Sequence, residues 1–380
     1  MSEKRQLQKT SSRKGRGREV KTIKARKSKA KNARGQKETV VKLFLADPTE
    51  QTASDLLACF DDRKSVQTWI VDNVADLMDS HLHCLANAGF DLGADLEDGR
   101  NLLHVFATNP CKSMAKNVKR LKFICDCGAD IEQETCCGCS TPLLEALMGD
   151  GDLLGAMALL RVGADINNSG CCDYRSPLML VLNYIDSSVL DKFISLGADV
   201  NYVASDGESA ASLAVHNSAA LERLFEAGAD VNWHNKRGEG LVHKFIAECN
   251  WNEQYGKDED GDTLFFAAPS DWGLKELIYN GAQIDAIDNK GLTPLESRIE
   301  RCEKWFLGES DMHQGQRIRV MKNALKSIVD CAVMLKRFGA KAECVMQLAS
   351  GPEGVSAYFS SNENRFPQLA SYVNSSGQIN

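Results

Sequence analysis

Residues 190–201 read LDKFISLGADVN, and residues 221–232 read LERLFEAGADVN, so one pattern occurs twice in close succession. In both stretches apolar side chains stand seven and four residues before the glycine, as Leu190 and Phe193 do in the first. This spacing is typical of a helix that buries one face. Glycine ends such a helix readily, because it adopts a left-handed backbone conformation that costs other residues more.

The same phrase recurs along most of the chain. The glycines that open it, or a weaker copy of it, are Gly89, Gly128, Gly163, Gly197, Gly228, Gly281 and Gly339. The first four intervals between successive glycines cluster near 33 residues. The last two intervals are wider, which indicates the same unit with insertions. The residues four places before each glycine are all apolar: Leu85, Ile124, Leu159, Phe193, Leu224, Leu277 and Leu335. Such a repeat predicts stacked supersecondary units.

A helix start follows each glycine after twelve or thirteen residues. Thr141-Pro142, Ser176-Pro177 and Thr293-Pro294 place a hydroxyl at the N-cap and proline in the first turn. His104 and His243 belong to the same slot in other units. Between glycine and cap lie turn signals such as Asp98-Gly99, Asp206-Gly207 and Lys290-Gly291. Each unit is therefore predicted to hold a turn, an inner helix and an outer helix.

The glycine phrase and the threonine-proline-leucine cap resemble the ankyrin repeat family over roughly residues 85–340. The resemblance implies an all-α, ankyrin-repeat solenoid, in which helix pairs stack into a right-handed, curved array and β-hairpin loops project from them. It also implies that His104 and His243 serve as structural histidines that bond the loops. One unit cannot bury its apolar face alone, so its neighbours complete the core.

We expect five segments in the chain. They are a disordered basic arm (1–38), an N-terminal helical cap (39–88), the repeats (89–295), an extended C-terminal helical repeat or cap (296–348) and a C-terminal tail (349–380). Within the cap, residues 64–85 are expected as one helix. The repeats contain an insertion at about 250–270, and residues 258–264 are open to interpretation as the start of a truncated repeat.

Charge is divided unevenly along the chain. Residues 1–38 hold fifteen Lys or Arg and three Glu, a net charge of +12, which leaves −19 for the remainder when the whole chain carries −7. With few apolar residues the arm cannot offset its ordering entropy, so disorder is expected. Nucleic acid binding, nuclear import, and contact with the acidic body or self-association all remain open as roles. The arm residues singled out are Arg13, Lys14, Arg16, Arg18, Lys24, Arg26, Lys27 and Lys29.

The chain has no apolar run of the roughly 18–20 residues that a membrane span requires, and its first residues lack the apolar region of a signal peptide. We therefore expect a soluble protein without membrane contact in a reducing compartment, either cytoplasmic or, in a eukaryotic cell, nuclear. The fourteen cysteines are then expected as thiols, several of them as small core residues.

Seven cysteines concentrate between residues 125 and 172. Cys125 and Cys127 fall at the end of an outer helix and are expected in the core. Two pairs lie eight and nine residues after their repeat glycines, which places them on adjacent loops with one further cysteine: Cys136, Cys137, Cys139, Cys171 and Cys172. We expect thiols, and hence no metal or cofactor. Tetrahedral zinc is the alternative, although the spacing lacks a C-x2-C pair.

No pattern in the chain indicates catalysis. Phosphate-loop, HExxH and GxSxG sequences are absent. The acidic run Asp258–Asp262 lacks the glycine and glutamate positions of an EF-hand loop. We therefore expect no enzyme.

Aromatic residues stand five places after two consecutive repeat glycines. These are Tyr202 and Trp233, and the latter is followed by His234, Lys236 and Arg237. We interpret them as an anchor with a polar rim for a partner protein, bound on the concave hairpin and inner-helix face that the resemblance implies. Packing of the two rings on each other is the structural alternative. Two other functions stay open: a nucleic-acid-associated protein that uses the arm, and a viral or bacterial effector directed at a host protein.

Overall fold

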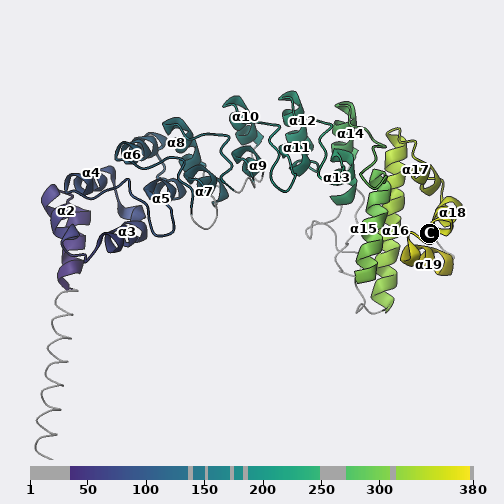
Figure 1. Ribbon diagram of the computed structural model, residues 1–380, viewed down its shortest axis with the longest axis horizontal. Helices are drawn as coiled ribbons and strands as arrows, with labels where there is room; N and C mark the ends of the chain where they lie inside the picture. Colours follow the sequence, from purple (N-terminus) through teal and green to yellow (C-terminus); the bar gives the residue numbers. More distant parts are fainter. Residues whose placement is uncertain are drawn as a thin grey trace, which may run out of the picture. The chain divides into compact units, whose positions relative to one another are not determined.

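The computed structural model describes residues 35–135, 140–149, 153–171, 175–182, 187–248, 271–308 and 314–376. The chain divides into two compact units, residues 1–165 and 166–380, and Figure 1 shows that the described part of each consists of paired helices. Unit 1 begins with a helix over residues 35–46. It continues with α2 (Glu50–Leu57), α3 (Arg63–Asp72), the short 3-10 helix η1 (Val74–Asp76), α4 (Asp79–Asn87), α5 (Leu102–Thr108), α6 (Met114–Asp126), α7 (Pro142–Met148) and α8 (Leu154–Val162).

Unit 2 continues the alternation of short inner and outer helices and ends in a group of helices. Its elements are α9 (Pro177–Val181), α10 (Ser187–Ser195), α11 (Ala210–Leu213), α12 (Ser218–Glu226), α13 (Leu241–Glu248), α14 (Asp271–Tyr279), α15 (Pro294–Gly308), α16 (Gln314–Arg337), α17 (Glu343–Leu348), α18 (Pro352–Ser361) and α19 (Pro367–Ser376). Outer helices α10, α12 and α14 pack in succession, and inner helices α9, α11, α13 and α15 do the same. The fold is the all-α, ankyrin-type stack of helix pairs that the repeats predict.

The repeat glycines end the outer helices as expected. All seven have positive φ, between 89° and 116°. In every copy the backbone N–H after the glycine donates to the carbonyl four residues before the glycine, at 2.9–3.3 Å. This is the long hydrogen bond of a Schellman motif, which satisfies a carbonyl at the helix end.

The apolar stripe before each glycine forms the core. The residues at four and seven places before the seven glycines are all 3% exposed or less. The residues three places before them are half-buried, apart from the exposed Lys336. Because every helix buries the same stripe against its neighbours, the sequence period becomes a continuous core within each unit.

The inner helices begin at the predicted caps. The side chain of Thr141 accepts from Leu144 N–H at 3.3 Å, and that of Ser176 accepts from Met179 N–H at 3.4 Å, each with proline in the first turn. At the start of α15, the Thr293 hydroxyl accepts from Glu296 N–H, and Thr293 N–H donates to the Glu296 carboxylate in return. Local sequence therefore decides where these helices start.

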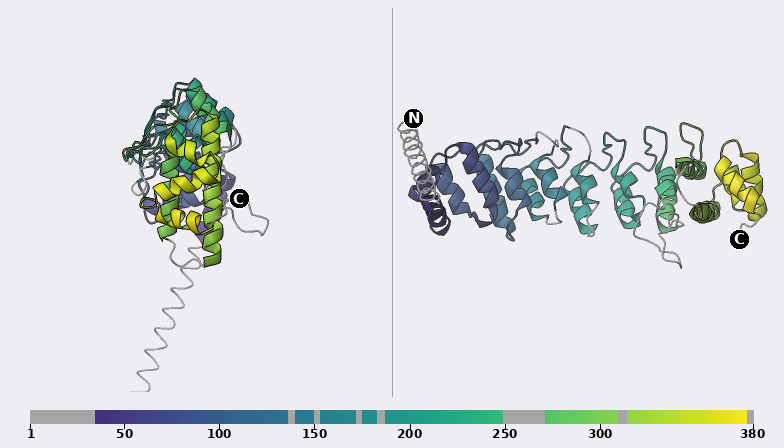
Figure 2. Two further views of the ribbon diagram at one scale, coloured as in Figure 1. Left: turned by 90° about the vertical axis from the view of Figure 1, so that its right-hand side faces the viewer. Right: turned by 90° about the horizontal axis from the view of Figure 1, so that it is seen from below.

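The loops between repeats are hairpins closed by minimal β-structure. Two isolated antiparallel bridges, Val203 with Ser209 and His234 with Gly240, are the β-pairing found in the described residues. Figure 2 (right) shows the loops of unit 2 projecting from one side of its helices. The predicted projecting hairpins are thus present in short form.

Two stretches differ from the sequence-based expectation. Residues 64–85, expected as one helix, are divided into α3 and α4 by η1, where Asn73 ends α3 and its amide donates to Trp69 O at 2.8 Å. Residues 349–380, expected as a tail, hold α18 and α19, and Phe359 on α18, Leu369 on α19 and Phe366 between the two helices are fully buried. The region 296–348, expected as an extended helical repeat or cap, contains most of α15, the long α16 and the short α17.

Candidate protein-binding face

In several repeats the residue four places after the repeat glycine joins neighbouring repeats. Asn201 Oδ1 accepts from Asp230 N–H at 2.8 Å, and its Nδ2 donates to Gly228 O at 3.0 Å. Asn167 makes the same two bonds to Asp199 N–H and Gly197 O, at 2.8 and 3.2 Å. The asparagine of the GADVN phrase is therefore a bridge between hairpin bases.

Carboxylates replace the asparagine at two further junctions. In unit 1, Glu132 accepts from Asp165 N–H at 2.7 Å. In unit 2, Asp285 accepts from Lys341 N–H at 2.6 Å. The position four places after the glycine keeps a hydrogen-bond acceptor while its residue type changes. The glycine phrase alone therefore does not reveal these bridges between repeats.

One junction of unit 2 lacks the bridge although it has the asparagine. Asn232 stands four places after Gly228, yet its side chain makes no hydrogen bond to Gln283 or Gly281 in the next described repeat. The wide spacing between Gly228 and Gly281 marks this junction as one that carries an insertion. The wider interval between Gly281 and Gly339 nevertheless keeps its bridge through Asp285, so spacing alone does not account for the missing one.

A cavity of about 300 Å³ lies at this unbridged junction. Its walls come from the hairpin after Gly228, the start of α13 and the segment after Gly281, and include Asn232, Trp233, His234, Gln283 and Ile287. Trp233 is only 6% exposed, and its Nε1–H has no hydrogen-bond partner. An unpaired buried donor is energetically costly, so a hydrogen-bond acceptor beside the indole N–H would stabilise it.

Contacts between hairpin tips hold the loops of unit 2 in place. Lys236 Nζ donates to Ser205 O at 2.8 Å, and Asn289 N–H donates to Arg237 O at 2.9 Å. The Arg175–Asp206 ion pair links the preceding tips at 2.9 Å. The cavity therefore opens between loops that are tied at their ends, a preformed arrangement suited to binding.

A buried carboxylate supports the same hairpin. Burial by itself would raise the pKa of Glu239, but hydrogen bonds from Asn235 and Arg301 outweigh it and hold the pKa below its ordinary value. The Arg301–Glu239 distance is 2.9 Å. Glu239 is consequently ionised at neutral pH and fixes the hairpin to α15.

The five residues proposed from sequence have different surroundings. Tyr202 is half-buried and its hydroxyl lies 2.8 Å from Ser169 Oγ. Trp233 is buried, so it forms a wall of the cavity rather than a protruding anchor. His234, Lys236 and Arg237 are exposed, and of these three side chains only that of Lys236 is committed to a hydrogen bond within the described residues.

Sequence reasoning missed a row of exposed residues that lies one position further along the hairpins. Six residues after the repeat glycines stand Val203, His234 and Ile287, of which Val203 is 50% and Ile287 65% exposed. The fifth position faces inward and the sixth faces outward, as the alternation of an extended segment requires. Applying that alternation to the hairpins would have found the row.

Three buried histidines are committed to backbone bonds. His243 is 1% exposed, and its Nδ1 accepts from Gly240 N–H at 3.4 Å while Nε2 bonds Leu292 O at 3.0 Å. Burial lowers the pKa of His243 and of His104, which bonds Asn101 N–H and Ser140 O in the same way. Fully buried His81 repeats the arrangement with Met78 N–H and Leu45 O, which sequence reasoning did not foresee.

The cysteines occupy several environments. Cys302, Cys331 and Cys344 are buried thiols of the core, as expected for several of them. Cys125 and Cys127, expected in the core, are half-buried thiols, and burial raises the pKa of Cys125 to about 11. Cys125 is therefore protonated and weakly nucleophilic at neutral pH.

The loop cysteines lie mostly beyond what the structure describes. Cys136, Cys137, Cys139 and Cys172 fall outside the described residues. Cys171 is disulfide-bonded, which corrects the thiol expected there. The described residues contain no His, Cys, Asp and Glu group of metal-binding geometry.

Other predicted features have no described position. The arm residues Arg13 to Lys29, the acidic run 258–262 and the proposed repeat start at 258–264 all lie outside the described residues. Among the helices that are described, none combines the length and apolar character that crossing a membrane demands.

Solved structures of ankyrin repeat domains are similar to this chain at a low level. No family model matches the chain, and no curated protein matches it. The human ASB11 ankyrin repeat domain is similar at 15% identity and a TM-score of 0.43, with 60% of this chain and 90% of that domain covered. The ankyrin repeat domain of Bcl-3, described as a unique member of the IkappaB protein family, is similar at 17% identity and 0.42, with 60% and 92% covered. The fold assignment therefore rests on the repeats and the helix stacking of the chain itself.

Proposed function

We propose that this protein is a non-enzymatic interaction scaffold and that the hairpin face of unit 2 binds a segment of a partner protein. The observation that carries the proposal is the cavity at the unbridged junction, bordered by exposed apolar and basic residues. Interaction sites commonly combine a pocket for an anchoring group with a polar rim. Here Trp233 and His234 line the pocket, and exposed Arg237 directly precedes the lining residue Gly238 in the chain.

The chemistry of the walls favours an extended peptide segment. Asn232 and Gln283 line the cavity with exposed side-chain amides that have no hydrogen-bond partners in the described structure. Such groups pair with the carbonyls and N–H groups of a peptide backbone. Exposed Ile287 beside them offers contact to an apolar side chain.

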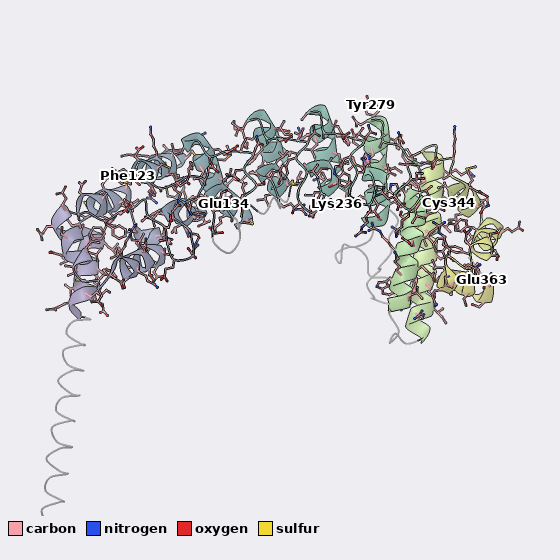
Figure 3. The ribbon with its side chains drawn as sticks, viewed as in Figure 1. Phe123, Glu134, Lys236, Tyr279, Cys344 and Glu363 are labelled. Carbon is pink, nitrogen blue, oxygen red and sulfur yellow. The ribbon has the colours of Figure 1, made fainter. Side chains whose placement is uncertain are left out.

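The test compares affinity purifications with wild-type protein and with an Ile287→Asp, Arg237→Glu variant. Both residues are exposed, so the unfolding temperature should stay within about 2 °C. Partners that use the face should be retained at least about tenfold less by the variant, a loss of about 1.4 kcal/mol. Tyr279→Asp is the matched control, since Tyr279 is 85% exposed and lies on a different edge of unit 2 from Lys236 in Figure 3.

Trp233 requires a separate variant because it is buried. Trp233→Ala would lower stability by about 3–5 kcal/mol and confuse the two effects. Trp233→Phe keeps most of the ring but reshapes the cavity wall, so binding should weaken while the fold persists. Retention of every wild-type partner by both the double variant and Trp233→Phe would exclude the hairpin face as the binding surface.

A further inference from the structure

The long helix α16 carries an open stripe on a face that the neighbouring helices α17 and α19 only partly cover. Its members are spaced by four, three, four and four residues, the spacing of one helical face: Ile318, Lys322, Leu325, Val329 and Val333. Leu325 is buried, whereas Ile318 and Val333 at the two ends are 48% and 51% exposed. The stripe is about 22 Å long at 1.5 Å per residue.

The middle of this stripe is one wall of a groove of about 430 Å³. The opposite wall comes from the start of α18 and from α19, through Pro352, Val355 and Tyr372. The volume is in the range of sites that hold a ligand or several side chains of a partner. Figure 1 places α16, α18 and α19 together in the C-terminal part of unit 2, away from the labelled inner helices α9 and α11.

The rim of the groove is basic although the body of the protein is acidic. Lys322 and Lys326 line the groove, are exposed, and make no ion pair in the described structure. The N-terminus of α18 reaches the groove at Pro352, and Glu353 in its first turn offsets the partial positive charge of the helix end. Asp330 is the acidic residue of the lining.

We propose that this groove is a second docking surface, which takes an amphipathic, acidic helical segment of a partner protein. Apolar side chains of the segment enter between Val329 and Val355, and its carboxylates pair with Lys322 and Lys326. The choice of occupant rests on charge complementarity and on the length and apolar character of the stripe. Amphipathic helices bind grooves of this kind through residues at helical spacing. The surface is distinct from the hairpin face and functions independently of it.

The test uses two fluorescein-labelled peptides of about 16 residues with leucine at helical spacing. One carries glutamate at the flanking positions and the other carries lysine there. Fluorescence anisotropy with the full chain should show the acidic peptide binding at least about tenfold more tightly, a difference of about 1.4 kcal/mol. Its affinity should fall between about 50 and about 300 mM NaCl, because the rim charges are exposed.

Variants locate the binding on the groove. Lys322→Glu with Lys326→Glu should weaken the acidic peptide about tenfold or more, and Val333→Glu should weaken it by a smaller factor. Lys116→Glu with Lys119→Glu on α6 makes the same change in net charge at sites outside the groove and should stay within about twofold of wild type. Circular dichroism melting curves confirm that all variants fold.

Three outcomes overturn the proposal. Equal affinity for both peptides removes the charge argument, and an equal loss in the α6 control shows a nonspecific charge effect. Light scattering that shows a dimer abolished by Val333→Glu makes a second copy of this chain the occupant instead. Binding that depends on Lys322 and Lys326 but survives Ile287→Asp supports the groove even where the hairpin face fails its own test.

Discussion

Replacement of Gly155 by alanine tests the packing of unit 1, because sequence and structure give opposite signs for its effect. Gly155 lies within the first turn of α8, and alanine is favoured over glycine in a helix by about 0.8–1.0 kcal/mol. From sequence alone, Gly155→Ala should therefore stabilise the protein.

The structure indicates a loss instead. A Cβ on Gly155 would lie 1.8 Å from Ala107 O, on the neighbouring helix α5, while real Cβ contacts do not fall below 3.0 Å. The obstacle is backbone, so no side-chain rotation relieves it, and the two helices must move apart to admit the methyl group. Such a gap forfeits a large part of the dispersion energy between α5 and α8.

The net magnitude follows from two opposing effects. Overpacking lowers the unfolding free energy by about 1–3 kcal/mol, and by more when the obstacle cannot move. The better helix propensity of alanine raises it by about 1 kcal/mol. We expect a loss of about 2 kcal/mol in unfolding free energy. For a unit of this size the melting temperature should fall by about 4–8 °C.

Urea and thermal denaturation followed by circular dichroism measure the effect. Gly149→Ala is the matched control, since Gly149 has ordinary φ of −74° and Ala146 O would be 3.8 Å from the new Cβ. The control should be neutral or slightly stabilising. A rise in melting temperature for Gly155→Ala would refute the close approach of α5 and α8.

Three further effects are expected. Gly228→Ala forces a side chain into φ of 90° with no steric contact within 4 Å, so denaturation should show a loss of about 1–2 kcal/mol from backbone strain alone. Asn201→Ala removes two bridging bonds and should cost about 1 kcal/mol, whereas Asn232→Ala at the unbridged junction should cost less than about 0.5 kcal/mol; equal losses would contradict the bridge. His104 and His243 are buried with lowered pKa, so their stability contribution is present above the unfolded value of 6.5 and is lost as pH falls below it; chemical denaturation from pH 7.5 to 5.5 should show a decline that His104→Gln with His243→Gln reduces.

The fold was predictable because its signals are local. A glycine that ends a helix and apolar residues four and seven places before it describe one helix and its buried face, without reference to any neighbour. The break at Asn73 was not predictable in this way. The stretch 64–85 keeps helical spacing throughout, and the bond from the Asn73 amide to Trp69 O that closes α3 depends on the folded chain.

The sequence singled out the hairpin that carries the candidate site, but it did not predict the surroundings of the side chains there. Position in the repeat identifies the hairpin that carries Trp233, yet burial of that ring depends on the loops beside it. The α16 groove could not be foreseen from an interpretation of residues 349–380 as a tail. Signals were nevertheless present there, since Pro352 and Pro367 open α18 and α19 and apolar residues follow each at helical spacing.

The junction after Gly228 shows why residue identity alone does not define the hairpin face. Asn232 is the residue type that bridges repeats at Asn167 and Asn201, so the sequence predicts a third bridge where the structure has a cavity. Repeat stacks derive their stability from interfaces between neighbours, and a junction without its bridge is held by fewer bonds at the loop base. The exposed side-chain amides of Asn232 and Gln283 stay without partners in the described structure, and tied hairpin tips hold the cavity beside them in position. The length of an insertion does not decide whether a junction is bridged, because the wider interval from Gly281 to Gly339 keeps its bridge through Asp285.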